Sequence, residues 1–187
     1  MKRLFYLLAA AAFTACGSAT TLSVMTFNMR YDNPEDGADN WRFRRGRVAE
    51  VIASHGVDVF GTQELLANQL GDLKRLLPGY AAVGVGREDG AEAGEFSAVF
   101  YRRDRFTPLE SGTFWLSETP DVAGSKGWDG ACERVATWVV LHDREGGREF
   151  LFVNTHLDHV GQVARDEGVN LLRERIEACL LYTSDAA

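Results

Sequence analysis

The chain has few cysteines and few prolines, and it has no surplus of positive charge. Only three cysteines and four prolines occur among 187 residues. Cys132 and Cys179 are too few and too far apart for the disulfide framework of a small exported domain, so the fold has to rest on its hydrophobic core. The net charge of −7 argues against a broad basic face that holds nucleic acid. A small anionic substrate, held by a few local charges or by a metal, stays open.

The longest apolar run lies at the start of the chain and has the pattern of a signal peptide over residues 1–19. Lys2 and Arg3 precede this run, which is too short to anchor the chain across a bilayer, and small residues follow it. The segment "FTAC" followed by "GS" is similar to the bacterial lipoprotein box, in which the cysteine, here Cys16, is acylated and anchors the protein to a membrane. Ordinary cleavage near Ala19 is the alternative. Both predict an extracytoplasmic protein that is periplasmic, secreted or an outer-membrane lipoprotein.

The full sequence is 45% hydrophobic, and the part that follows the leader is interpreted as one domain over residues 20–178. Hydrophobic periodicity predicts helices at 41–55, 65–77 and from 162 onward, and an irregular segment at 111–132. Strands are expected at 21–28, 57–64, 80–86, 134–143 and 148–156, with two more inside 96–110. Because helices and strands alternate first and hairpins follow, the order predicts a layered α/β sandwich with mixed sheets covered by helices.

Polar side chains gather where three of these strands end. Asn28 ends the first strand, Glu64 ends the second, and "NTHLDH" from Asn154 to His159 spans the end of the last. Ligands of layered α/β folds sit outside strand ends, so these groups are candidates for one common site. Carboxylate and amide oxygens suit Mg²⁺ or Mn²⁺, which complete their coordination with water and substrate phosphate.

Several motifs together resemble the endonuclease/exonuclease/phosphatase family, which has the DNase I-like fold. They are "TFNMRYDN", "GTQE", "GREDGAEAGEFSAVFYRRDRF", "FWLSETP", "GSKGWDGACERVATW" and "NTHLDH". The resemblance runs from about Leu22 to about Ala178. It implies a Mg- or Mn-dependent hydrolase of phosphoester bonds, acting on a phosphorylated small molecule, a lipid or a nucleic acid, and monomeric at full length.

The resemblance also implies roles for individual residues. Asn28 and Glu64 match metal-site residues, and Arg134 is similar to an arginine that contacts phosphate in some members. His156 matches the histidine that faces the scissile phosphate, and Asn154 looks like part of the same catalytic strand end. Asp158 and His159 look like an additional substrate-binding pair of one bacterial branch.

Each of these residues has an alternative structural role. Asn28 can simply end a strand, and Glu64 can be a carboxylate favoured at a helix N-terminus. His156 can be a buried structural histidine, His159 an exposed residue at a helix start, and Arg134 a partner of a surface carboxylate.

The chain does not contain the family's downstream "GD-x-N" and "SDH" motifs, and residues 179–187, "CLLYTSDAA", break the helical pattern without a cap. We therefore expect a domain that is truncated at its C-terminus, with a non-native tail from 179. On this hypothesis the full-length protein is a metal-dependent phosphoesterase and this chain is an inactive fragment. The alternative is an exported ligand-binding lipoprotein, or a scaffold for another protein, on the same fold.

Overall fold

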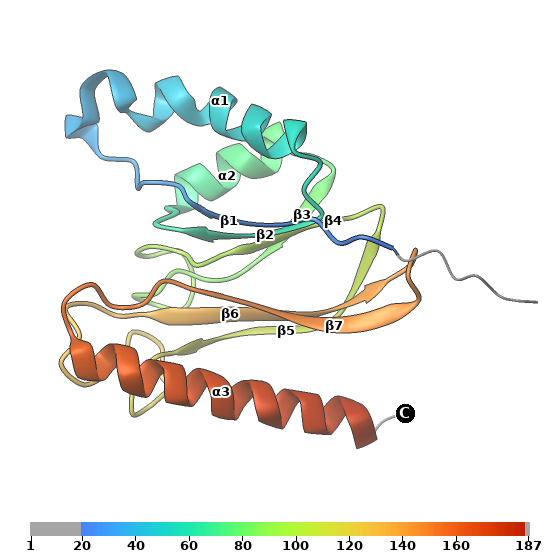
Figure 1. Cartoon of the computed structure of the whole chain (residues 1–187). Helices are drawn as coiled ribbons and strands as arrows, with labels where there is room; N and C mark the ends of the chain where they lie inside the picture. Colours follow the sequence, from blue (N-terminus) through green and yellow to red (C-terminus); the bar gives the residue numbers. More distant parts are fainter. Residues whose placement is uncertain (1–19, 186–187) are drawn as a thin grey trace, which may run out of the picture.

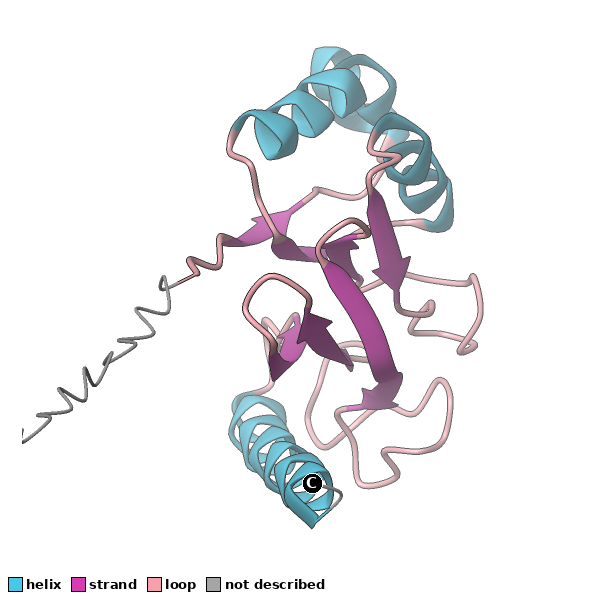
Figure 2. Cartoon of the chain, turned by 90° about the vertical axis from the view of Figure 1, so that its right-hand side faces the viewer, coloured by secondary structure: helices cyan, strands magenta, loops and turns pink. Residues whose placement is uncertain are grey.

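The computed structural model describes residues 20–185, which form four layers (Figure 1). Two β-sheets stack face to face in the middle. Helices α1 (Trp41–Ser54) and α2 (Ala67–Leu76) cover the outer face of one sheet, and α3 (Gln162–Asp185) runs along the outer face of the other. Figure 2 shows the same arrangement from the side, with helices on the two outer sides of the sheets. The layered α/β sandwich predicted from the sequence is confirmed.

The predicted signal peptide, with Cys16, lies outside the described residues. Within residues 20–185, no helix is both long enough and apolar enough to cross a membrane.

The first sheet brings the ends of two parallel strands to one edge. Its strands follow the order β1-β2-β4-β3. Their bounds are β1 Val24–Asn28, β2 Val59–Gln63, β3 Tyr80–Val83 and β4 Val99–Arg102. β1 and β2 run parallel with Asn28 opposite Gln63, so the residues that follow both strands emerge together.

The second sheet is an antiparallel meander of β5 (Phe106–Trp115), β6 (Val135–Asp143) and β7 (Arg148–Thr155). Thr155 at the end of β7 pairs with Ala136 near the start of β6, which brings the segments around His156 and Arg134 together. The irregular segment begins later than predicted, because β5 pairs with β6 as far as Trp115. Within the described residues, four strands pair with a neighbour on one side only: β1, β3, β5 and β7.

Apolar side chains fill the space between the sheets, and a buried ion cluster joins the sheets at one end. Val59, Val99 and Leu141 are fully buried there. Arg105 donates to Asp58 and to Asp143, each at 2.8 Å, and is only 4% exposed. The guanidinium stabilises the ionised carboxylate and lowers the pKa of Asp143 to about 2. This cluster lies at the start of β2, away from the strand ends that carry the candidate site.

Two helices present a different face to the core from the one predicted. Phe43 was expected inward on α1 but is 61% exposed, because Trp41 takes the core side and a residue two positions later points about 200° away. On α3, Val163 and Val169 were also expected inward, yet each is about half exposed. The helix instead turns Ala164 and Gly168 inward, and the absence of a side chain at Gly168 allows a close approach to Leu116. The helix also continues to Asp185 rather than breaking after 178.

Candidate active site

A cavity of about 350 Å³ opens at the ends of β1, β2 and β7. This volume lies within the range of small-molecule sites. Nine residues line it: Arg30, Tyr31, Glu64, Arg87, Glu95, Cys132, Arg134, His156 and His159. Of the seven residues predicted for the site, four therefore line the cavity, and Asn28, Asn154 and Asp158 are not among the lining residues.

Glu64 is held by its neighbours in an unusual backbone conformation. It directly follows β2 with a φ of 57°, a left-handed conformation that costs a non-glycine residue about 1–3 kcal/mol. Its carboxylate accepts a hydrogen bond from Asn28 Nδ2 at 2.9 Å and a longer one from the Tyr31 backbone N–H at 3.4 Å. Such strain persists only where the surroundings fix it, and it is frequent at active sites. The structure thus directs the Glu64 carboxylate into the cavity.

Asn28 contacts Glu64 through its side-chain amide nitrogen. Its side-chain oxygen accepts the backbone N–H of Arg30 at 2.9 Å, and its Nδ2 donates to Glu64. Asn28 therefore orients the carboxylate, and its role as a direct metal ligand stays a prediction. A carboxylate on a cavity wall, with arginines beside it for phosphate, fits Mg²⁺ or Mn²⁺, because these ions typically take one or two protein carboxylates and substrate oxygens.

His156 lies half-buried in the cavity wall, and its Nδ1 is buried without a hydrogen-bond partner among the described residues. Burial lowers the pKa of His156, and the positive charge of Arg134 lowers it further. At neutral pH the imidazole is therefore neutral, so it can donate one N–H to a phosphate oxygen without adding a charge.

Arg134 is fixed in place by the two other residues predicted beside it. Its Nε donates to Asp158 at 3.4 Å and its Nη2 lies 3.0 Å from His159 Nδ1. Because a guanidinium only donates, His159 Nδ1 is the acceptor in this contact. Arg134 is only 6% exposed, so its charge is directed by these contacts toward the cavity that it lines.

Asp158 lies behind Arg134 rather than on the cavity wall, and it is 3% exposed. Its carboxylate accepts three backbone N–H groups, those of Ala131, Val160 and Gly161. Burial alone raises the pKa of such a carboxyl, but these hydrogen bonds together hold the pKa of Asp158 far below its usual value. Asp158 is therefore ionised at neutral pH and positions Arg134, whereas direct substrate binding by Asp158 stays a prediction.

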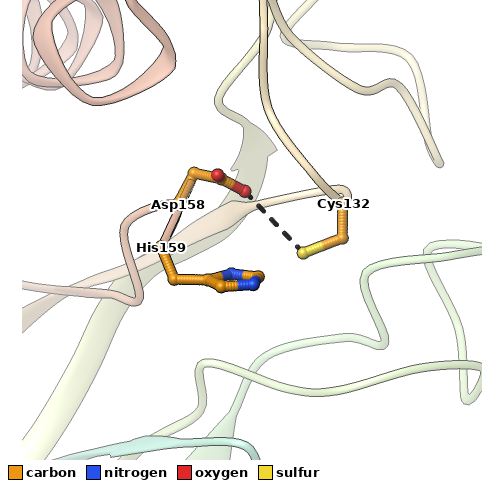
Figure 3. Close-up of side chains that lie close together, drawn as sticks. All are labelled: Cys132, Asp158 and His159. Atoms are coloured by element: carbon orange, nitrogen blue, oxygen red, sulfur yellow. Dashed lines mark hydrogen bonds between the residues drawn. The ribbon is translucent and has the colours of Figure 1, made fainter. Parts of the chain in front are cut away.

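Cys132, Asp158 and His159 place three possible ligand atoms within 4.8 Å of one another (Figure 3). The thiol of Cys132 donates to Asp158 at 3.8 Å. The same carboxylate oxygen already accepts the Ala131 N–H and Arg134 Nε, so these hydrogen bonds explain the cluster without a metal. The positive charge of Arg134 also disfavours a cation at this position.

Asn154 lies beneath the cavity and joins the two sheets. Its side-chain oxygen accepts Gln63 Nε2 at 2.8 Å, and its Nδ2 donates to the carbonyls of Thr62 at 2.8 Å and Ala98 at 3.1 Å. It fits because Gly61 has no side chain, since a Cβ there would stand 2.3 Å from the Asn154 oxygen. The catalytic role predicted for Asn154 stays a prediction, and its observed contacts are structural.

Sequence reasoning missed three charged residues on the cavity wall, Arg30, Arg87 and Glu95. Arg87 and Glu95 both lie in the glycine-rich segment "GREDGAEAGEF", which was noted as a motif without a role for its charged residues. Alternating charges in a loop are usually solvated, so their type alone gave no reason to place them here.

Comparisons with known proteins agree with this architecture. The model of the "Endonuclease/Exonuclease/phosphatase family" matches residues 25–185. An endonuclease/exonuclease/phosphatase from Bacteroides vulgatus is 46% identical with a TM-score of 0.85, over 87% of this chain and 62% of that one. The mannosyl-6-phosphatase of Bacteroides thetaiotaomicron is also 46% identical, with a TM-score of 0.83, over 85% of this chain and 60% of that one.

A curated relative is more distant. The 3'-5'-exoribonuclease subunit Ccr4 of the CCR4-Not complex from Aspergillus clavatus is 25% identical over 77% of this chain and 26% of that protein. The chain thus spans about 60% of the two solved bacterial structures and about a quarter of this relative. The family model covers most of the chain and the fold agrees, so the chain belongs to the endonuclease/exonuclease/phosphatase family, whose members hydrolyse phosphoester bonds.

Proposed function

We propose that the protein carrying this chain is a metal-dependent hydrolase of small phosphomonoesters. The observation that carries the proposal is the convergence of Glu64, Arg134 and His156 on one cavity of about 350 Å³. The small cavity and the net charge of −7 favour a small anionic substrate over a nucleic-acid strand. The 46% identity with a bacterial mannosyl-6-phosphatase supports a phosphomonoester over a diester.

Each of these residues has one role in the proposed hydrolysis. Water attacks phosphorus in line with the leaving oxygen, the P–O ester bond breaks, and the alcohol leaves with a proton. Glu64, oriented by Asn28, would hold the cation, which would supply positive charge to stabilise the phosphate oxygens. Arg134 pairs with a second phosphate oxygen, and neutral His156 donates a hydrogen bond as negative charge develops there.

Location and assembly belong to the proposal too. The leader pattern of residues 1–19 supports export, with Cys16 as an acylated anchor or with ordinary cleavage as the alternative. We also propose that the full-length protein is a monomer.

The proposal is tested by phosphate release from the full-length protein with and without Mg²⁺. We expect turnover of p-nitrophenyl phosphate and of hexose 6-phosphates that is lost in EDTA and restored by excess Mg²⁺ or Mn²⁺. Bis-p-nitrophenyl phosphate and single-stranded DNA should be cleaved much more slowly. Hydrolysis that persists in EDTA would contradict metal dependence. Tight binding of phosphate without turnover would favour the ligand-binding protein on the same fold.

A further inference from the structure

The cavity contains a charged pair that the proposed phosphate chemistry does not use. Arg87 Nη1 donates to Glu95 Oε2 at 2.6 Å, and the two side chains are only 15% and 20% exposed. Both residues line the same cavity as Glu64 and His156. Moving two such charges out of water costs free energy. The stability of the fold therefore does not by itself explain why the pair lies here.

Unsatisfied hydrogen-bonding groups concentrate at this cavity. Among the described residues, only two buried side-chain nitrogen or oxygen atoms lack a partner, Arg87 Nε and His156 Nδ1, and both belong to cavity-lining residues. Native proteins leave few such atoms, and each calls for an explanation such as a bound molecule. Arg87 Nη2 and Glu95 Oε1 also lack partners within residues 20–185, and neither atom is buried. The pair thus offers a free donor beside a free acceptor.

Hydrogen bonds within the loop fix the positions of Arg87 and Glu95. Gly86 N–H donates to the Ala91 carbonyl at 2.9 Å, and Arg87 N–H donates to the Glu95 carbonyl at 3.2 Å. Asp89 accepts the N–H groups of Ala91 and Ala93 inside the loop. Trp115 Nε1 anchors it to β5 by donating to the Arg87 carbonyl at 2.6 Å. A loop ordered before binding loses less entropy when a ligand arrives.

We propose that Arg87 and Glu95 form a subsite for vicinal hydroxyl groups, which makes polyol phosphates, and sugar phosphates in particular, the substrate class. A hydroxyl group donates and accepts one hydrogen bond at the same oxygen, so two neighbouring hydroxyls match a guanidinium N–H beside a carboxylate oxygen. The phosphate then lies at the Arg134 and His156 end of the cavity. Arg87, Glu95, Arg134 and His156 line one cavity of about 350 Å³, so one small molecule can reach both ends. This inference rests on the proposed function.

The test compares two phosphomonoesters of primary alcohols in the full-length protein with Mg²⁺. Mannose 6-phosphate carries vicinal hydroxyls, and n-hexyl phosphate has none. We expect Glu95→Gln to lower the ratio of their kcat/KM values by about 10- to 100-fold, mainly through a higher KM for the sugar phosphate, because hydrogen bonds to charged groups contribute about 1.5–3 kcal/mol. Glu88→Gln is the matched control, because Glu88 is exposed in the same loop and does not line the cavity. The ratio of the two kcat/KM values should be the same in this variant as in the wild type.

A second variant covers the case in which Glu95→Gln does not fold. Arg87→Lys keeps the positive charge but loses the planar fork, and it should lower the same ratio. If the two variants slow both substrates equally, or neither, the pair only stabilises the loop and the inference is overturned. If the wild type hydrolyses n-hexyl phosphate as well as mannose 6-phosphate, the subsite fails although the proposed function stands. If the wild type hydrolyses neither these substrates nor p-nitrophenyl phosphate, the proposed function and the inference fail together.

Discussion

Glu64→Gln is expected to lower Mg²⁺-dependent phosphoester hydrolysis by the full-length protein by about 10³-fold or more, which corresponds to about 4 kcal/mol of transition-state stabilisation. The substitution keeps the size of the side chain but removes the negative charge that we assign to the cation. It also places a carboxamide opposite Asn28 Nδ2 and the Tyr31 N–H, which now donate to a carboxylate. The measurement is kcat/KM for p-nitrophenyl phosphate as a function of Mg²⁺ concentration.

A control separates this effect from a general loss of charge. Glu50 is exposed on α1, far in sequence from any cavity-lining residue, so Glu50→Gln should keep wild-type activity. The thermal unfolding midpoint of Glu64→Gln should stay close to that of the wild type, because the carboxylate is on the cavity wall and not in the core. Undiminished activity of Glu64→Gln would refute the metal assignment.

Asn154→Ala is expected to lower the free energy of unfolding by about 3 kcal/mol. The change removes three hydrogen bonds between β7 and the other sheet, to Gln63, Thr62 and Ala98, and each contributes about 1 kcal/mol when it is buried. Gly61 leaves room for the Asn154 side chain, so alanine also leaves a void. Urea unfolding monitored by tryptophan fluorescence measures the difference.

The control is Asn170→Ala on α3, where the side chain is exposed and, among residues 20–185, bonds only to Glu167 at 3.3 Å. Its effect should be about 0.5 kcal/mol or less. If Asn154→Ala were as stable as the wild type yet inactive, Asn154 would touch the reacting groups, as the sequence resemblance implied, and its structural role would be minor.

Much of the candidate site could be predicted because it depends on where strands end. Glu64 and His156 follow strands with clear hydrophobic patterns, and the parallel pairing of β1 with β2 is a common arrangement that brings Asn28 and Glu64 together. Their residue types and the quoted motifs then pointed to phosphoester chemistry. The layered fold followed from the order of the elements in the same way.

What could not be predicted depends on packing and on loop conformation. The inward face of α3 is set by the close approach of Gly168 to Leu116, a contact that helical periodicity does not contain, so Val163 and Val169 were misplaced. The inward position of Arg87 and Glu95 results from hydrogen bonds inside one glycine-rich loop and from its anchor on Trp115. Asn154 was placed at the strand end correctly, but only the stacking of two sheets shows that its amide points into the interior.

The most direct test of the metal-dependent account is the position of Mn²⁺ in crystals of the full-length protein grown with Mn²⁺ and phosphate. Anomalous difference density should show the ion bound to a Glu64 carboxylate oxygen, with the phosphate between the ion and Arg134. Density at the Cys132, Asp158 and His159 cluster, with none beside Glu64, would contradict the assignment of Glu64 as the metal-binding residue. The absence of any Mn²⁺ from the cavity at saturating concentration would contradict metal-dependent hydrolysis at this site.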